Sequence, residues 1–148
     1  MIKAVFNILT ICGAAGFAGV MLNIGVTLGG YWRSLPTQEF LDWFAANNQF
    51  VSRSIPIIFV PTFLGLVGSI WLSWGAPELR YWLLSAACIL VVAVLTFAFF
   101  VPTNSAFASG TMDEATGAAK LSQWLMIHNF RIGFGMAAAV FGCIAIKF

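Results

Sequence analysis

Charged side chains are scarce in this sequence, which has 7 lysines and arginines and 5 aspartates and glutamates among 148 residues. Only 8% of the residues are charged, whereas a soluble domain typically has about 25%. So few charges cannot cover a water-facing surface, which excludes a soluble enzyme, a nucleic-acid-binding protein and a disordered chain. The hydrophobic content of 61% predicts an integral membrane protein whose main partner is the lipid bilayer.

Four apolar runs are long enough to cross a bilayer, which takes about 20 residues. They cover residues 4–32, 54–77, 81–102 and 121–146. Alternating segments of the kind that build a membrane barrel are lacking. We therefore expect an all-α fold, a four-helix bundle forming a single transmembrane domain over residues 1–148. We expect it in a bacterial inner membrane, with termini in the cytoplasm because acidic residues gather on the opposite side.

The connections between these runs carry their own signals. Residues 35–46 form an amphipathic pattern that predicts a short interfacial helix, with Phe40, Trp43 and Phe44 facing either the lipid or the bundle. Thr111 and Glu114 have the spacing of a capping box, which predicts a helix start near residue 112. Pro102 predicts the end of the third span.

Ionisable side chains occur inside one predicted span only, where His128 and Arg131 lie in the fourth. Together with Trp124 they are spaced i, i+4 and i+7, so all three share one helix face. Three further polar side chains fall at a similar depth: Asn23, Tyr31 and Asn104. Because ionisable groups inside a membrane are costly and often functional, we expect a site here that binds a hydrophobic small molecule.

A purely structural interpretation of the same residues stays open. An arginine near a membrane surface can extend its charge to the interface, and a neighbouring histidine can bond a carbonyl. Trp124 and Tyr31 also fit an aromatic belt at the membrane surface. Asn23 and Asn104 can hold helices together through hydrogen bonds.

The residue types restrict the chemistry of such a site. A single histidine cannot form a tri-histidine metal centre, and without a carboxylate inside a span a di-iron site or a Ser-His-Asp triad is unsupported. Two options remain. His128 can act as a base while Arg131 stabilises an anion, or His128 can be a ligand to haem or copper.

Two short motifs resemble a known family. The order Val101-Pro-Thr-Asn104, followed by Trp124-Leu-Met-Ile-His128-Asn-Phe-Arg131, is similar to the anthrone-oxygenase-like family of small four-span membrane proteins. Members of that family oxidise anthrones to anthraquinones with dioxygen and without a dedicated organic cofactor. The resemblance marks Asn104, Trp124, His128 and Arg131 as site residues.

Three functions therefore compete at this point. The first is a membrane oxygenase acting on an anthrone- or polyketide-like aromatic, with His128 as base, Arg131 as oxyanion holder, and Trp124 and Tyr31 lining the pocket. The second is a haem- or copper-binding redox protein with His128 as ligand. The third is a non-enzymatic subunit of a larger membrane complex, and a homo-oligomer is compatible with each.

Overall fold

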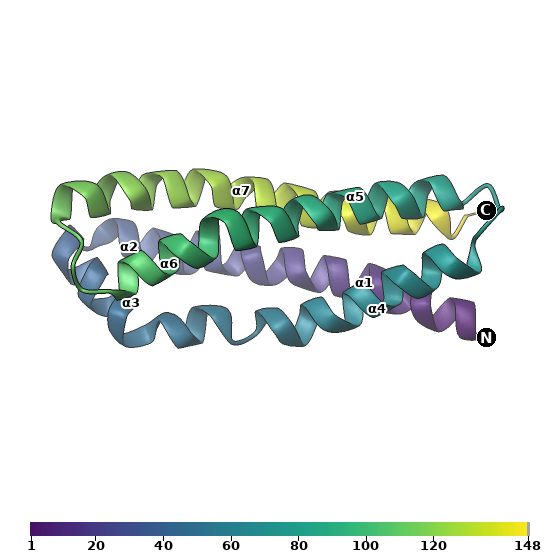
Figure 1. Ribbon diagram of the computed structural model, residues 1–148, viewed down its shortest axis with the longest axis horizontal. Coiled ribbons are helices and arrows are strands. Elements are labelled where there is room, and N and C mark those ends of the chain that lie inside the picture. The colour runs from purple at the N-terminus through teal and green to yellow at the C-terminus, as the bar shows by residue number, and fades with distance from the viewer. Residues whose placement is uncertain (148) are drawn as a thin grey trace.

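The computed structural model describes residues 1–147 and forms an elongated bundle of helices (Figure 1). Four helical stretches are long and apolar enough to cross a membrane, as the sequence predicts: Ile2–Ser34, Ile55–Leu72, Leu79–Ala108 and Glu114–Ala145. No strand occurs among the described residues. The all-helical class and the four-span integral membrane architecture are therefore confirmed.

Two of the four spans contain a wide π-helical turn. The first span consists of α1 (Ile2–Asn23), the π turn η1 (Ile24–Leu28) and α2 (Gly29–Ser34). The third consists of α5 (Leu79–Leu95), the π turn η2 (Thr96–Phe100) and α6 (Val101–Ala108). Such turns are rare and frequently mark functional sites.

The third span continues past Pro102, where the sequence predicts its end. A proline ring inside a regular helix collides with the carbonyl one turn earlier and removes a hydrogen bond. Here Pro102 lies near the start of α6, directly after η2, and the wider π turn gives the ring room. The helix can therefore extend to Ala108, with Asn104 on the side that faces α7.

The amphipathic connection forms helix α3 (Thr37–Ser52), which lies at the end of the bundle far from both termini (Figure 1). Phe40 and Phe44 are fully buried and pack on Trp32 and Phe107. The apolar face of α3 therefore covers this end of the bundle, as the sequence pattern predicts.

The packing between the long helices is uneven. The helix α1 packs extensively against α4 (Ile55–Leu72) and α7 (Glu114–Ala145), and α5 packs against α7. By contrast, α4 and α5 contact each other over a short stretch only, although a tight turn at Gly75 joins them. The bundle is consequently least closely packed between α4 and α5.

The start of α7 differs from the predicted capping box. The N-cap is Asp113, whose carboxylate accepts the backbone N–H of Thr116 at 2.9 Å, and Glu114 is the first helical residue. Thr111 instead pairs its hydroxyl with that of Ser109 at 2.8 Å. The capping-box prediction was therefore wrong, because Asp113 lies nearer the helix and is an equally good N-cap residue.

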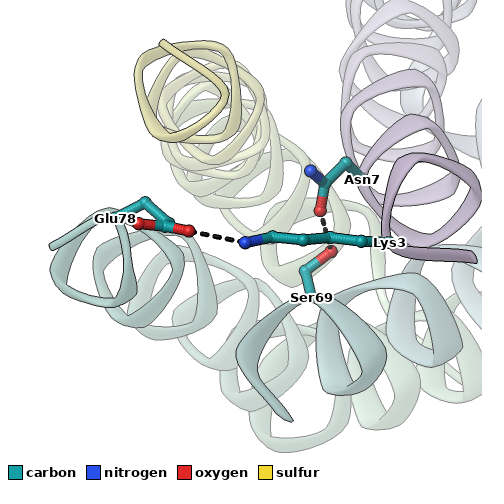
Figure 2. Close-up of polar contacts among 4 residues, drawn as sticks. All are labelled: Lys3, Asn7, Ser69 and Glu78. Carbon is teal, nitrogen blue, oxygen red and sulfur yellow. Dashed lines mark hydrogen bonds and ion pairs between the residues drawn. The ribbon is translucent and has the colours of Figure 1, made fainter. Parts of the chain in front are cut away.

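Polar side chains link three elements at the end of the bundle that holds both termini (Figure 2). Lys3 donates to Glu78 at 2.5 Å, and Ser69 donates to Asn7 at 2.9 Å. The hydrogen bond from Lys3 lowers the pKa of the Glu78 carboxyl from its ordinary value. These contacts join α1 to the end of α4 and to the turn before α5.

Candidate functional site

His128 lies on α7 and is almost completely buried, with 1% of its surface exposed. Its Nε2 lies 2.8 Å from the backbone carbonyl oxygen of Met21 on α1. A carbonyl can only accept, so in the neutral ring Nε2 carries the hydrogen and Nδ1 keeps a lone pair. Nδ1 has no partner among the described residues. The hydrogen bond therefore leaves one ring nitrogen free to accept a proton.

This hydrogen bond can form because α1 and α7 lie close together at this point. Met21 lies just before η1, and its carbonyl also accepts the backbone N–H of Ile24. Gly25 lies in η1, where a Cβ atom would come within 3.1 Å of His128 Cδ2. A side chain at this position would crowd the imidazole, so glycine is what allows His128 to lie against the π turn.

Arg131 lies one turn further along α7 and is 2% exposed. Its Nε and Nη2 have no hydrogen-bond acceptor among the residues that the structure describes. The guanidinium instead lies over the ring of Phe100, 4.1 Å from the centroid, and 5.7 Å from the centroid of Phe17. Buried charges are normally paired, so this guanidinium has unused capacity to bind an anion.

Trp124 covers one face of the imidazole, and Asn104 holds Trp124 in place. The Trp124 ring stacks on His128 with centroids 4.6 Å apart and planes 12° from parallel. Its indole N–H donates to Asn104 Oδ1 at 2.8 Å, across from α7 to α6. Phe100 packs against both rings in a T-shaped arrangement. The four residues of the sequence motifs therefore belong to one cluster, in which the half-buried Asn104 orients the buried Trp124.

The structure does not bring Asn23 and Tyr31 into this cluster. Asn23 is exposed and accepts a hydrogen bond from Thr27 on its own helical stretch at 3.0 Å. Tyr31 is 45% exposed and contacts the edge of Trp43 on α3. Both side chains lie on the outer face of the first span.

Three contributors to the cluster were not anticipated from the sequence: the Met21 carbonyl, Phe17 and Phe100. Any residue can supply a backbone carbonyl, so sequence carries no signal for Met21. Phe17 and Phe100 are two of 15 phenylalanines and look like ordinary core residues. The glycine at position 25 was the one available hint, since a small residue allows close helix contact.

The donor set for a metal is small. The described residues contain no group of three or more histidine, cysteine, aspartate or glutamate side chains able to hold a metal ion. His128 is therefore the single side chain of the cluster that could bind haem iron or copper, through Nδ1. Stacked Trp124 covers one of its faces.

Fold and cluster together define a class: a small four-span membrane protein with a buried histidine, arginine and tryptophan inside its bundle. The chain belongs to the anthrone oxygenase family, whose sequence model matches residues 40–141. That range includes most of α3 and every motif residue from Asn104 to Arg131, whereas Met21 and Gly25 precede it. No curated protein and no solved structure matches the chain significantly.

Proposed function

We propose that this protein is a membrane oxygenase that uses dioxygen to oxidise a hydrophobic aromatic substrate of the anthrone or polyketide type. His128 is the base, Arg131 holds the developing oxyanion, and Trp124 orients the imidazole. Family membership supports oxygenase chemistry. The observation that carries the residue roles is the free Nδ1 of His128, one turn of α7 away from a buried guanidinium without an acceptor.

The hydrogen bond to Met21 supports the assignment of His128 as base. It fixes the ring and its tautomer, so that Nδ1 is the nitrogen that takes the proton. The Met21 carbonyl also stabilises the imidazolium that forms, because the hydrogen bond from Nε2–H becomes charge-assisted. A base held in this way needs no rearrangement when the proton arrives.

The unpaired guanidinium supports the role of Arg131. Loss of a proton from the substrate carbon creates an enolate, whose negative charge lies mostly on oxygen. Arg131 Nε and Nη2 are free to donate to that oxygen. In a site without bulk water this stabilisation is stronger than in solution.

The proposed reaction balances without a further reductant. His128 removes one proton from the methylene carbon of an anthrone, and the enolate carbon then bonds to dioxygen and gives a hydroperoxide after protonation. Loss of the remaining hydrogen from that carbon breaks the O–O bond and releases water. The methylene becomes a ketone, one oxygen atom enters the product, and four electrons pass from the carbon to dioxygen.

Oxygen uptake by the purified protein tests this proposal, with anthrone as substrate and autoxidation in protein-free micelles subtracted. We expect His128→Ala to lose nearly all turnover and Arg131→Gln to lose about 10²–10³-fold, the usual effect of removing an oxyanion donor. Asn129→Ala changes an exposed polar neighbour on α7 and serves as the matched control. Full turnover in His128→Ala would overturn the proposal.

The two alternatives give different results on the same samples. A haem band in the visible spectrum, or stoichiometric copper, that is lost in His128→Ala would make His128 a metal ligand. A colourless, metal-free protein without oxygen uptake, recovered in a stable complex with a larger membrane protein, would favour a non-enzymatic subunit.

A further inference from the structure

A cavity of about 310 Å³ lies between α4, α5 and η2. Phe59 and Val60 of α4 form one wall, Ala93 of α5 and Phe97 of η2 form the opposite wall, and Phe17 of α1 lies behind them. Its lining is apolar: the one hydroxyl, on Thr96, donates back to the Val92 carbonyl at 2.7 Å. The cavity therefore suits a ligand without polar groups along its sides.

The mouth of this cavity faces the lipid. Val60, Phe97 and Val101 line it and are also exposed on the outside of the bundle. It lies where α4 and α5 make few contacts with each other, so it opens between two spans rather than at a membrane surface. A ligand dissolved in the bilayer can reach it without crossing water.

The inner wall of the cavity leads to Arg131. Phe17 lines the cavity and also lies 5.7 Å from the guanidinium. Phe100, which directly precedes the lining residue Val101, has its ring centroid 4.1 Å from the guanidinium. The ring of Phe17 therefore contacts both the apolar cavity and the side chain whose Nε and Nη2 have no partner among the described residues.

A second cavity provides a comparison within the same groove. It measures about 390 Å³, lies between α4 and α5, and shares Phe59 and Ala93 with the first. Its other lining residues, such as Ala87, do not line the first cavity. It is equally apolar, but Phe17, the residue beside the Arg131 guanidinium, does not line it. Such a cavity suits the acyl chains of the surrounding lipid.

We infer that the cavity behind Val60 and Ala93 holds the flat apolar body of the substrate, which enters sideways from the bilayer with its oxygen-bearing edge toward Arg131. This inference rests on the proposed function for the identity of the substrate. The volume lies at the lower end of the usual range for ligand pockets, about 300–1,000 Å³, which favours two or three fused rings over a long flexible chain. The side chains at positions 60 and 93 then set the size of substrate that is accepted.

Binding of anthrone itself under anaerobic conditions, where its oxidation cannot proceed, tests the inference without any turnover. Its absorption change is titrated against the detergent-purified protein. We expect Ala93→Phe and Val60→Phe, which fill the cavity from opposite walls, each to weaken binding by about tenfold or more. Ala87→Phe fills only the second cavity and is the matched control, with an expected change of less than about twofold.

The outcomes separate the pocket from the chemistry. Unchanged binding in both cavity-filling variants, or an equal loss in Ala87→Phe, would overturn the inference, and the latter would indicate a groove for acyl chains. Should Ala93→Phe fail to fold, as judged by circular dichroism and gel filtration, Val60→Phe decides, because that residue is 55% exposed. If binding responds as expected while the wild type consumes no oxygen, the pocket stands and the oxygenase proposal falls.

Discussion

At the scale of single residues, the hydrogen bond between His128 and the Met21 carbonyl determines what the imidazole can do. It gives the two ring nitrogens different roles, one bonded and one free. Arg131 complements this arrangement because two of its nitrogens have no acceptor among the described residues. The proposed base and the proposed anion site are therefore both buried polar groups without a hydrogen-bond partner. Such groups are costly and are rarely retained without a role.

Asn104 is expected to act through Trp124 rather than on the substrate. In Asn104→Ala the buried indole N–H loses its acceptor, so we expect a loss of about 1–3 kcal/mol in stability and a reduced turnover. Thermal unfolding followed by circular dichroism gives the first and oxygen uptake the second. Ser105→Ala is the control, since that exposed hydroxyl bonds only to Val101 on its own helical stretch and should change stability by less than about 0.5 kcal/mol.

A direct substrate role for Asn104 would give a different pattern. Restoring an acceptor with Asn104→Asp would then fail to recover turnover, although the indole N–H would again be bonded. Equal unfolding temperatures for Asn104→Ala and the wild type would also contradict the positioning role.

At the scale of elements, the π turns η1 and η2 matter most, because both adjoin the cluster. Met21 precedes η1, and Phe100 is the last residue of η2. A π turn shifts the register of a helix by one residue and so re-aims the side chains that follow. In the third span this shift also lets the helix pass Pro102 and carry Asn104 to Trp124.

Gly25→Ala tests the contact between η1 and α7. The added methyl group would lie 3.1 Å from His128 Cδ2 and 3.5 Å from Ile132 Cδ1, so we expect the imidazole to be displaced and turnover to fall. Gly30→Ala is the matched control, because nothing lies within 4 Å of a Cβ there. Removing a glycine from a helix should even stabilise that variant by about 0.5–1 kcal/mol.

Turnover that is equal in the two glycine variants would show that the position of His128 does not depend on η1. The comparison requires both proteins to be folded, which gel filtration and circular dichroism establish before the activity measurement.

The spans and the amphipathic helix were predictable from the sequence because they depend on apolar periodicity, which is local. The motif face on α7 was predictable for the same reason, since 3.6-residue spacing places Trp124, His128 and Arg131 together. The rotation of the first span about its own axis was not predictable from the sequence. Asn23 and Tyr31 lie on the outer face of this span, because the glycines at 25 and 29 turn toward α7 instead. Which face of a nearly uniform apolar helix turns inward is decided by such packing.

At the scale of the whole molecule, the bundle has one end covered by α3 and one end held by polar contacts. At the second end Lys3 and Glu78 join the start of the first span to the turn between α4 and α5 (Figure 2). This contact holds the turn that joins α4 and α5 at the end of the bundle near the termini. The cavity lies between the same two helices, further from that end. Their separation near the cavity is therefore compatible with a stable bundle.

The contact between Lys3 and Glu78 should make stability depend on pH in the acid range. The hydrogen bond from Lys3 lowers the pKa of Glu78 in the folded protein, so the ionised carboxylate favours folding. That stabilisation is fully present above the pKa of the unfolded chain and is lost as the pH falls through the lower pKa of the folded protein. We expect the unfolding temperature to drop less on acidification in Glu78→Gln than in the wild type.

Lys3→Met and the double variant complete the cycle for this pair. If the two single changes add without a coupling term, or if Glu78→Gln shows the same pH profile as the wild type, the carboxylate is not stabilised by Lys3.

The central claim is that His128 removes a proton from the substrate carbon, and the most direct test follows that proton without oxygen. Anthrone is incubated anaerobically in deuterated buffer with the detergent-purified protein, and deuterium incorporation at the methylene carbon is followed by NMR. Exchange in protein-free micelles gives the background. The account predicts exchange well above background in the wild type and background exchange in His128→Ala, with Asn129→Ala unchanged. Exchange in His128→Ala as fast as in the wild type would contradict it.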